Sequence, residues 1–248
     1  MEQLAILTIC TISGIFTGLL GIGGGLIIIP AFMIILPFFG ISHFTPHQII
    51  AISSTCVLLN SSFGLFYRRK EKFLDKKFVF SASTAVIIGT LISAYTTSYA
   101  PIKPIFAIYI LVCLISIYLM KHEVHFQFKN NGFLYLLFGF IGAISAAIGI
   151  GGAVLFATVL KCFRKETTKE LLPTITLIVA LHAVFAFLGK MCAGAIVYSV
   201  IPAALLASII GAKIGVKISK KLSTKIIENL MVLILLIAII RVGFEFFN

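Results

Sequence analysis

Long apolar stretches, separated by short polar connections, run through almost the whole of this chain. A helix needs about 20 apolar residues to cross a hydrocarbon core of roughly 30 Å, so the pattern predicts an all-α polytopic membrane protein. Each half of the chain carries one interrupted apolar segment followed by three spans. The predicted segments are 4–39, 48–66, 78–99 and 104–120 in the first half, and 133–160, 171–189, 195–212 and 227–247 in the second. A polar linker, 121–132, separates the predicted repeats 1–120 and 133–248.

A cluster of glycines interrupts the first apolar segment of each half. The first cluster consists of Gly21, Gly23, Gly24 and Gly25, and the second consists of Gly149, Gly151 and Gly152. Gly21, Gly23 and Gly24 fall on the second cluster with one constant offset of 128 residues. Each glycine weakens a helix by roughly 1 kcal/mol relative to alanine, and broken backbone within a membrane must face protein or water. The repetition therefore predicts an internal repeat with one helix break in each half.

The apolar arm after the second break, 153–160, would rise only about 12 Å and cannot cross a bilayer alone. It is either one limb of a re-entrant V or the continuation of one broken, crossing helix. If both breaks are re-entrant, seventeen of the 20 Lys and Arg residues lie in connections on a single face. These connections are 67–77, 121–132, 161–170 and 213–225. Because positive charge concentrates on the cytoplasmic side, we predict two inverted repeats, each a re-entrant V-shaped helix pair plus three transmembrane helices, with both termini outside.

Composition narrows the function. The chain is 60% hydrophobic and 11% charged, with a mean hydropathy of +1.15, which no soluble globular domain is expected to have. The net charge of +12 comes from short loops between apolar runs, so it indicates membrane topology and not a nucleic-acid partner. The sequence offers no metal-ligand cluster, no ordered catalytic set and no ATP-binding motif. We therefore expect no enzyme, no metal and no cofactor.

Two re-entrant breaks entering from opposite faces would bring two helix N-termini together. A helix N-terminus carries a partial positive charge and free N–H groups, so it binds anions without a formal cation. The predicted substrate-binding residues are Gly21, Gly23, Gly24, Gly25, Gly149, Gly151 and Gly152 through their backbone, and Ser53, Ser54 and Thr174 through their hydroxyls. The alternatives are tight helix packing for the glycines and bonding to their own helix carbonyls for the hydroxyls.

Two polar residues lie deep in predicted spans. Asn60 and His182 align between the halves at an offset of 122. Polar residues within membranes are costly and are commonly functional, and the charge of a histidine changes near neutral pH. His182 is therefore a candidate carrier of a coupling proton, with an interhelical hydrogen bond as the alternative.

The glycine-rich stretch GLLGIGGGLIIIPAF resembles the signature of the TauE/SafE sulfite exporter family, within the toluene-sulfonate uptake permease group. The segment that starts at Ile50 resembles the A-V-x-T-S segment of the family, and Gly211–Gly215 resembles its late G-x-x-x-G. The second half departs from the signature at Ala153 and Thr158.

The resemblance implies transport of sulfite, a sulfonate or a related sulfur-containing anion. Together with the two glycine breaks and the charge asymmetry, it leads us to expect a secondary transporter of the bacterial inner membrane that works by alternating access. Its partners would be the anion, membrane lipid and a coupling proton or other ion. The alternatives are an uncoupled anion channel and, from another class, a membrane enzyme or scaffold of sulfur metabolism. Neither the direction of transport nor the oligomeric state follows from the sequence.

Overall fold

The computed structural model describes residues 2–21, 23–38, 40, 44–96, 101–122, 132–164 and 166–247. The described residues form helices and connections, without a strand. The helices are α1 (Glu2–Leu20), α2 (Gly25–Phe38), α3 (Pro46–Arg68), α4 (Lys76–Thr96), α5 (Ile102–Lys121), α6 (Gly132–Ile148), α7 (Ala153–Phe163), α8 (Thr168–Cys192), the 3-10 turn η1 (Tyr198–Val200), α9 (Ile201–Lys221) and α10 (Thr224–Phe247).

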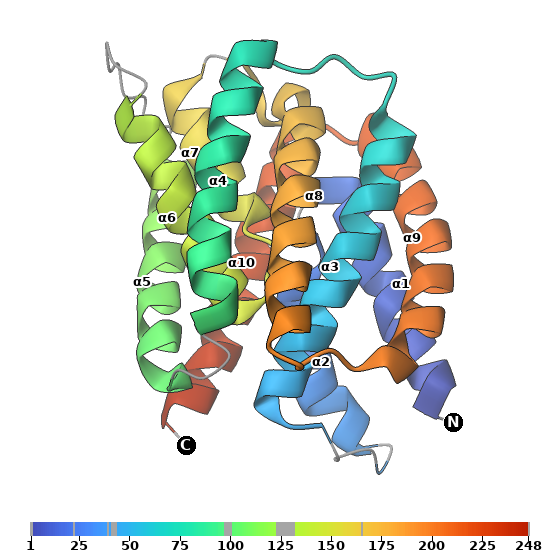
Figure 1. Cartoon of the computed structure of the whole chain (residues 1–248). Helices are drawn as coiled ribbons and strands as arrows, with labels where there is room; N and C mark the ends of the chain where they lie inside the picture. Colours follow the sequence, from blue (N-terminus) through green and yellow to red (C-terminus); the bar gives the residue numbers. More distant parts are fainter. Residues whose placement is uncertain are drawn as a thin grey trace.

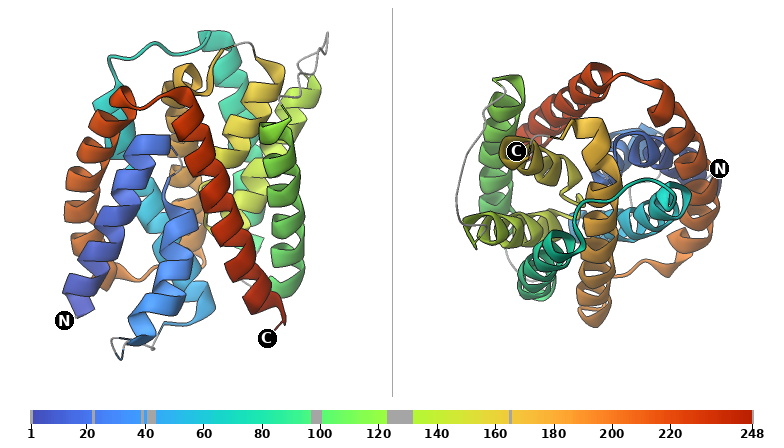
Figure 2. Two further views of the ribbon diagram at one scale, coloured as in Figure 1. Left: turned by 180° about the vertical axis from the view of Figure 1, so that it is seen from behind. Right: turned by 90° about the horizontal axis from the view of Figure 1, so that it is seen from above.

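The helices run roughly parallel to one axis, with their connections at the two ends of the bundle (Figure 1). The connections α3–α4, α7–α8 and α9–α10 lie at one end, which we call the basic end, and both chain termini lie at the other (Figures 1 and 2). The start of α1 and the end of α2 both lie at the end with the termini, whereas the start of α6 and the end of α7 lie at the basic end. Each glycine break is therefore a point where the chain turns back.

Five helices within the described residues are long and apolar enough to cross a membrane, namely α1, α3, α4, α8 and α9. The short helix α7 has 11 residues and spans about 16 Å, so it cannot cross a bilayer by itself. Helix α9 differs from its predicted span 195–212. Gly194, at φ +68°, lies directly before the predicted span, and η1 lies within its start, so α9 begins only at Ile201. The helix then runs on to Lys221, through most of the basic segment that follows the predicted span.

Glycines allow the helices to approach one another at backbone distance. Helix α1 packs along α9, and α4 packs along α6. A Cβ on Gly18 would overlap the carbonyl oxygen of Ala212, and one on Gly142 would lie 2.7 Å from the carbonyl oxygen of Val86. Helices α3 and α8 pack against each other. Close approach through small residues is how helices associate where lipid removes the hydrophobic driving force.

Replacement of Gly18 by alanine tests this packing. We expect Gly18→Ala to lower the stability by about 1–3 kcal/mol, since the added methyl group meets α9 backbone that has no free rotamer to move. The measurement is the Tm of the detergent-solubilised protein. Gly243→Ala is the matched control, because a Cβ on Gly243 in α10 meets nothing within 4 Å; it should be neutral or stabilising. Equal Tm values for the two variants would contradict the close α1–α9 contact.

Candidate functional site

The two glycine breaks have the same backbone conformation. Gly21, Gly23 and Gly24 have φ of 70°, 69° and 80°, and Gly149, Gly151 and Gly152 have φ of 77°, 78° and 61°. This left-handed region costs a side-chain-bearing residue about 1 kcal/mol or more, and glycine very little. The glycines are therefore required by the path of the backbone. α1 and α6 also end alike, with the N–H of Gly21 donating to Thr17 O and that of Gly149 to Ser145 O.

The two breaks meet in the interior of the protein. A Cβ on Gly23 would lie 3.7 Å from the Cα of Gly151, and a Cβ on Gly25 would lie 2.6 Å from the carbonyl oxygen of Gly149. All these glycines are buried. The side chain of Val57 on α3 contacts both breaks, because the Cβ positions of Gly23 and Gly151 lie 2.9 and 2.7 Å from it. The starts of α2 and α7 are thus brought together although 128 residues separate them in the chain.

Backbone donors at this meeting point have no partner among the described residues. The N–H groups of Gly23, Gly24 and Gly25 make no hydrogen bond there, and neither do those of Gly151, Gly152 and Ala153. Buried N–H groups are nearly always paired, and the first four of any helix have no partner within the helix. Two helix N-termini, each with roughly half a positive charge, therefore face the same buried region, which favours an anion between them.

Hydroxyl groups on α1 and α6 surround the breaks. Ser13 Oγ donates to the carbonyl oxygen of Gly24 at 3.0 Å, and Asn60 Nδ2 donates to Ser13 Oγ at 3.1 Å. A Cβ on Gly24 would overlap Ser13 Oγ, and one on Gly152 would overlap Ser145 Oγ. Ser145 Oγ is buried and has no hydrogen-bond partner among the residues that the structure describes. Ser13 and Ser145 were not predicted from the sequence, although the offset of 128 pairs Ser145 with Thr17, another hydroxyl beside Gly24.

Helices α3 and α8 contact the two breaks in corresponding ways. Gly21 faces Thr176 of α8, and Gly149 faces Ser54 of α3, each with 3.0 Å between the Cβ position and the hydroxyl oxygen. Thr176 donates to Leu172 O, and Ser54 donates to Ile50 O. Thr176 and Ser54 are related by the offset of 122 that also relates Asn60 to His182. Each break is therefore lined by the long helix of the other half.

The other predicted hydroxyls lie in different positions. Ser53 Oγ donates to Gly149 O at 2.6 Å, so Ser53 touches the second break but its proton is already used. Thr174 Oγ1 accepts from the N–H of Leu74 at 2.9 Å and so attaches the α3–α4 connection to α8. This contact gives Thr174 a structural role at the basic end, beside its predicted role in binding.

Asn60 and His182, the two polar residues of the predicted spans, are both buried. Asn60 Oδ1 has no hydrogen-bond partner, whereas its Nδ2 reaches Ser13. His182 Nδ1 lies 2.7 Å from Thr90 Oγ1 of α4, and the imidazole meets the ring of Phe156 edge-on. His182 thus links α8 to α4 and α7, which agrees with the interhelical alternative.

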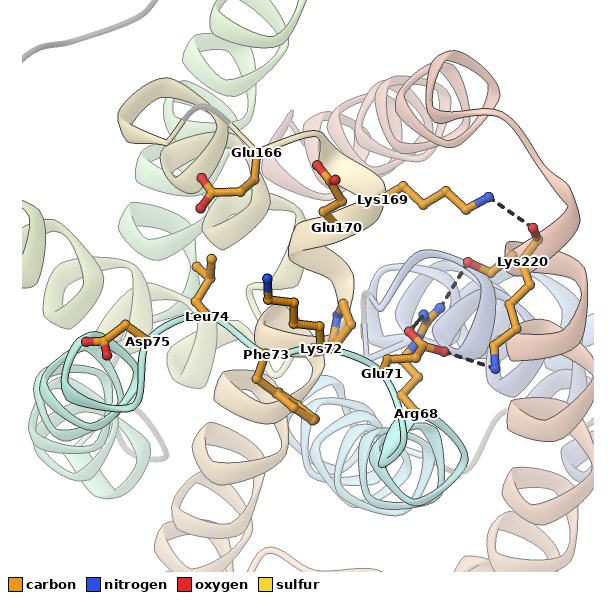
Figure 3. Close-up of a pocket in the computed structure, with 12 residues that line it drawn as sticks. Arg68, Glu71, Lys72, Phe73, Leu74, Asp75, Glu166, Lys169, Glu170 and Lys220 are labelled. Carbon is orange, nitrogen blue, oxygen red and sulfur yellow. Dashed lines mark hydrogen bonds and ion pairs between the residues drawn. The ribbon is translucent and has the colours of Figure 1, made fainter.

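A hollow of about 490 Å³ opens at the basic end (Figure 3). Its polar lining comes from the α3–α4 connection, the start of α8 and the end of α9. The charged residues are Arg68, Glu71, Lys72, Asp75, Glu166, Lys169, Glu170 and Lys220. Arg68, Glu71 and Lys220 are joined by ion pairs in this hollow.

Comparison with known families gives one match. The family model described as sulfite exporter TauE/SafE matches residues 6–242, nearly the whole chain. The chain belongs to the TauE/SafE family. No curated protein and no solved structure matches it. The resemblance in the glycine-rich segment is thereby confirmed.

Membership in the TauE/SafE family makes this chain a multi-pass membrane protein of a transporter family, with a small anion and lipid as the partners that the family implies. The described part of the chain holds no group of three or more His, Cys, Asp or Glu that could bind a metal ion. The glycine breaks of this TauE/SafE member present hydroxyls and backbone N–H groups.

Asn60 tests whether the polar contacts hold the first break. We expect Asn60→Ala to lower the stability by roughly 1–3 kcal/mol, because it removes a buried hydrogen bond to Ser13 and leaves a cavity. The readout is the Tm in detergent. Ser62→Ala, an exposed position on the same helix, should change the stability by less than about 0.5 kcal/mol. A neutral Asn60→Ala would show that the chain of contacts to Gly24 O contributes nothing.

Proposed function

We propose that this protein is a secondary transporter for a small sulfur-containing oxyanion, such as sulfite or a short sulfonate. The observation that carries the proposal is the convergence of two buried helix N-termini whose N–H groups have no partner in the described chain. An oxyanion with several equivalent oxygens can accept from both termini at once. The family match supports the sulfur chemistry, and the geometry supports the anion.

The charge of the site favours an anion that must later be released. No Lys or Arg side chain is among the closest neighbours of the break glycines in the described chain. Partial charges from N–H groups balance the anion without the full attraction of a buried cation, so the binding energy stays moderate. A transporter needs such a site, because an anion held too tightly would not leave on the far side.

The crowding at the site favours a small substrate. Val57 and Val179 lie within 3.2 Å of the Cβ position of Gly23, and Val57 also lies against Gly151. A methyl group could not be added at either glycine without moving a valine. In this conformation the breaks leave no room for an anion between them. We propose that they separate when the substrate binds, far enough for inorganic sulfite or a sulfonate with a short carbon chain but not for a bulky sulfonate.

We further propose that the halves are inverted repeats that rock about the breaks. The φ angles of the two breaks match at an offset of 128 residues. Helix α8 of the second half contacts the first break, and α3 of the first half contacts the second break. The α1–α2 and α6–α7 pairs also have opposite orientations in the bundle (Figure 1). Transporters with inverted repeats commonly bind substrate at such broken helices. In this proposal the basic end faces the cytoplasm of a bacterial inner membrane, the termini lie outside, and His182 is the candidate carrier of a coupling proton.

The test of the backbone site is transport by Gly24→Val in proteoliposomes, measured as uptake of radiolabelled sulfite. The variant should lose transport, because the new side chain overlaps Ser13 Oγ and Thr17 and Gly24 has a φ of +80°. Gly64→Ala is the matched control on α3, where the added Cβ makes only an ordinary 3.5 Å contact with Thr176. Retained transport by Gly24→Val would rule out the backbone site.

A gentler variant guards against simple misfolding. Ser145→Ala removes a buried hydroxyl that has no partner, so the fold should lose little, while sulfite affinity should fall about two- to tenfold if the hydroxyl donates to the anion. Ser208→Ala removes an equally buried hydroxyl that bonds within its own helix and should leave affinity unchanged. Acceleration of sulfite efflux by unlabelled sulfite outside would separate this carrier from an uncoupled channel.

A further inference from the structure

The hollow at the basic end contains a carboxylate held between two cations (Figure 3). Glu71 lies in the α3–α4 connection, three residues after Arg68. Its Oε2 accepts from Arg68 Nη1 at 2.8 Å, and its Oε1 lies 3.3 Å from Lys220 Nζ at the end of α9. Lys220 is 56% exposed and contributes little alone, but the Arg68 side chain is only 2% exposed.

On the side away from Glu71, the Arg68 guanidinium is hydrogen-bonded to two helices. Its Nη2 donates to Gly18 O on α1 at 2.7 Å and to Ser219 Oγ on α9 at 3.0 Å. Its Nε is buried and has no partner. A buried guanidinium needs an anion to offset its lost hydration, and in this conformation Glu71 provides it. Three of the five guanidinium N–H groups make these hydrogen bonds and two do not, so an anion with more oxygens than a carboxylate could satisfy the guanidinium more fully.

Through its hydrogen bond to Gly18, Arg68 is also connected to the end of α1, where the first glycine break begins. Gly18, whose carbonyl it binds, is three residues before Gly21 in the same helix end. The hollow is therefore separated from the break by the last turn of α1. Among the described residues, Arg68 forms an ion pair with Glu71 and with none of the other three acids of the lining, Asp75, Glu166 and Glu170. Asp75 accepts from the N–H of Phe78, and Glu170 accepts from that of Thr167.

We propose that Arg68 and Lys220 form a second anion site, a vestibule subsite at the basic end, in which the Glu71 carboxylate is a tethered occupant that the transported oxyanion replaces. This inference rests on the proposed function, because it assigns the transported anion as the ligand. Glu71 has the same charge sign and bonding pattern as that anion, and its side chain is 21% exposed in the α3–α4 connection. The exchange keeps Arg68 paired in both states, so neither state leaves a buried cation alone.

The experiment measures sulfite binding to the purified full chain in detergent by thermal shift, with sodium sulfite under nitrogen at constant ionic strength. A bound anion raises the Tm in proportion to the logarithm of its concentration. Glu71→Gln should lower the apparent Kd for sulfite at least about fivefold, because the competing carboxylate no longer occupies the site. Glu166→Gln, which removes one charge from the same hollow without touching Arg68, should shift the Kd less than about twofold.

Two further variants locate the effect. Arg68→Gln in the Glu71→Gln background leaves no unpaired carboxylate, and it should abolish the gain in affinity. Glu71→Gln in the Gly24→Val background should keep the gain, because the vestibule subsite does not use the glycine break. If Glu71→Gln and Glu166→Gln lower the apparent Kd for sulfite equally, the effect comes from the change in the local electrostatic field alone. That result would overturn the proposal.

The binding results distinguish failure of the vestibule subsite from failure of the proposed function. If the unmodified protein binds and transports sulfite, but Glu71→Gln binds it no more tightly, the vestibule subsite is refuted and the central site stands. If neither the unmodified protein nor Glu71→Gln responds to sulfite or sulfate, both proposals fall.

Discussion

The structure depends on one electrostatic constraint, the burial of two helix N-termini against each other. α2 begins at Gly25 and α7 begins at Ala153, directly after Gly152, and six N–H groups at these buried starts have no partner in the described chain. Like partial charges at contact distance repel, and unpaired donors cost free energy when they are removed from water. A fold that keeps this arrangement must compensate elsewhere or bind something at the meeting point.

In the described chain, the side chains packed around the breaks do not act as acceptors for these N–H groups. α3 and α8 each send a valine toward the junction, and α1 and α6 each bring hydroxyls beside a glycine. Outside the junction, α1 and α9 approach at backbone distance through Gly14, Gly18, Gly211 and Gly215. The small residues therefore have two uses: a positive φ at the breaks, and close helix contact along the long helices. The sequence pattern is the same in both uses, and only the φ angles separate them.

This double use determines how much of the structure was predictable from the sequence. Membrane helices, the two breaks and the family were predictable, because apolar runs of this length and glycine clusters at one offset are rare outside repeated membrane folds. Ser145 was not identified as part of any site, and Arg68 was interpreted, with the other basic residues of the connections, as a membrane-topology signal. Ser145 is a small residue in an apolar run, and Arg68 belongs to a basic loop where exposure at the lipid headgroups is the usual outcome. Only the fold shows that Arg68 turns inward to α1 and α9.

The predicted hydroxyls show a second limit of prediction from the sequence. Ser53, Ser54 and Thr174 all belong to helices that line the core, but a one-dimensional pattern cannot tell which acceptor a hydroxyl reaches. Ser54 bonds back to its own helix, Ser53 reaches Gly149 O, and Thr174 holds the connection that carries Glu71. Three residues of similar chemistry thus make three different contacts: one within its own helix, one with a glycine break and one with a loop.

The ends of α3 and α8 extend the correspondence between the halves. The offset of 122 that pairs Ser54 with Thr176 also pairs Arg68 with Lys190, and Lys190 is likewise buried, at 3% exposure. Arg68 ends its helix at the basic end and Lys190 lies near the end of its helix at the other (Figure 1). If the halves are inverted copies, Arg68 and Lys190 are corresponding buried cations at opposite ends of the bundle. Two such cations would be redundant in a structure that opened to one side only, but each has a use in a carrier that presents the same anion to both faces in turn.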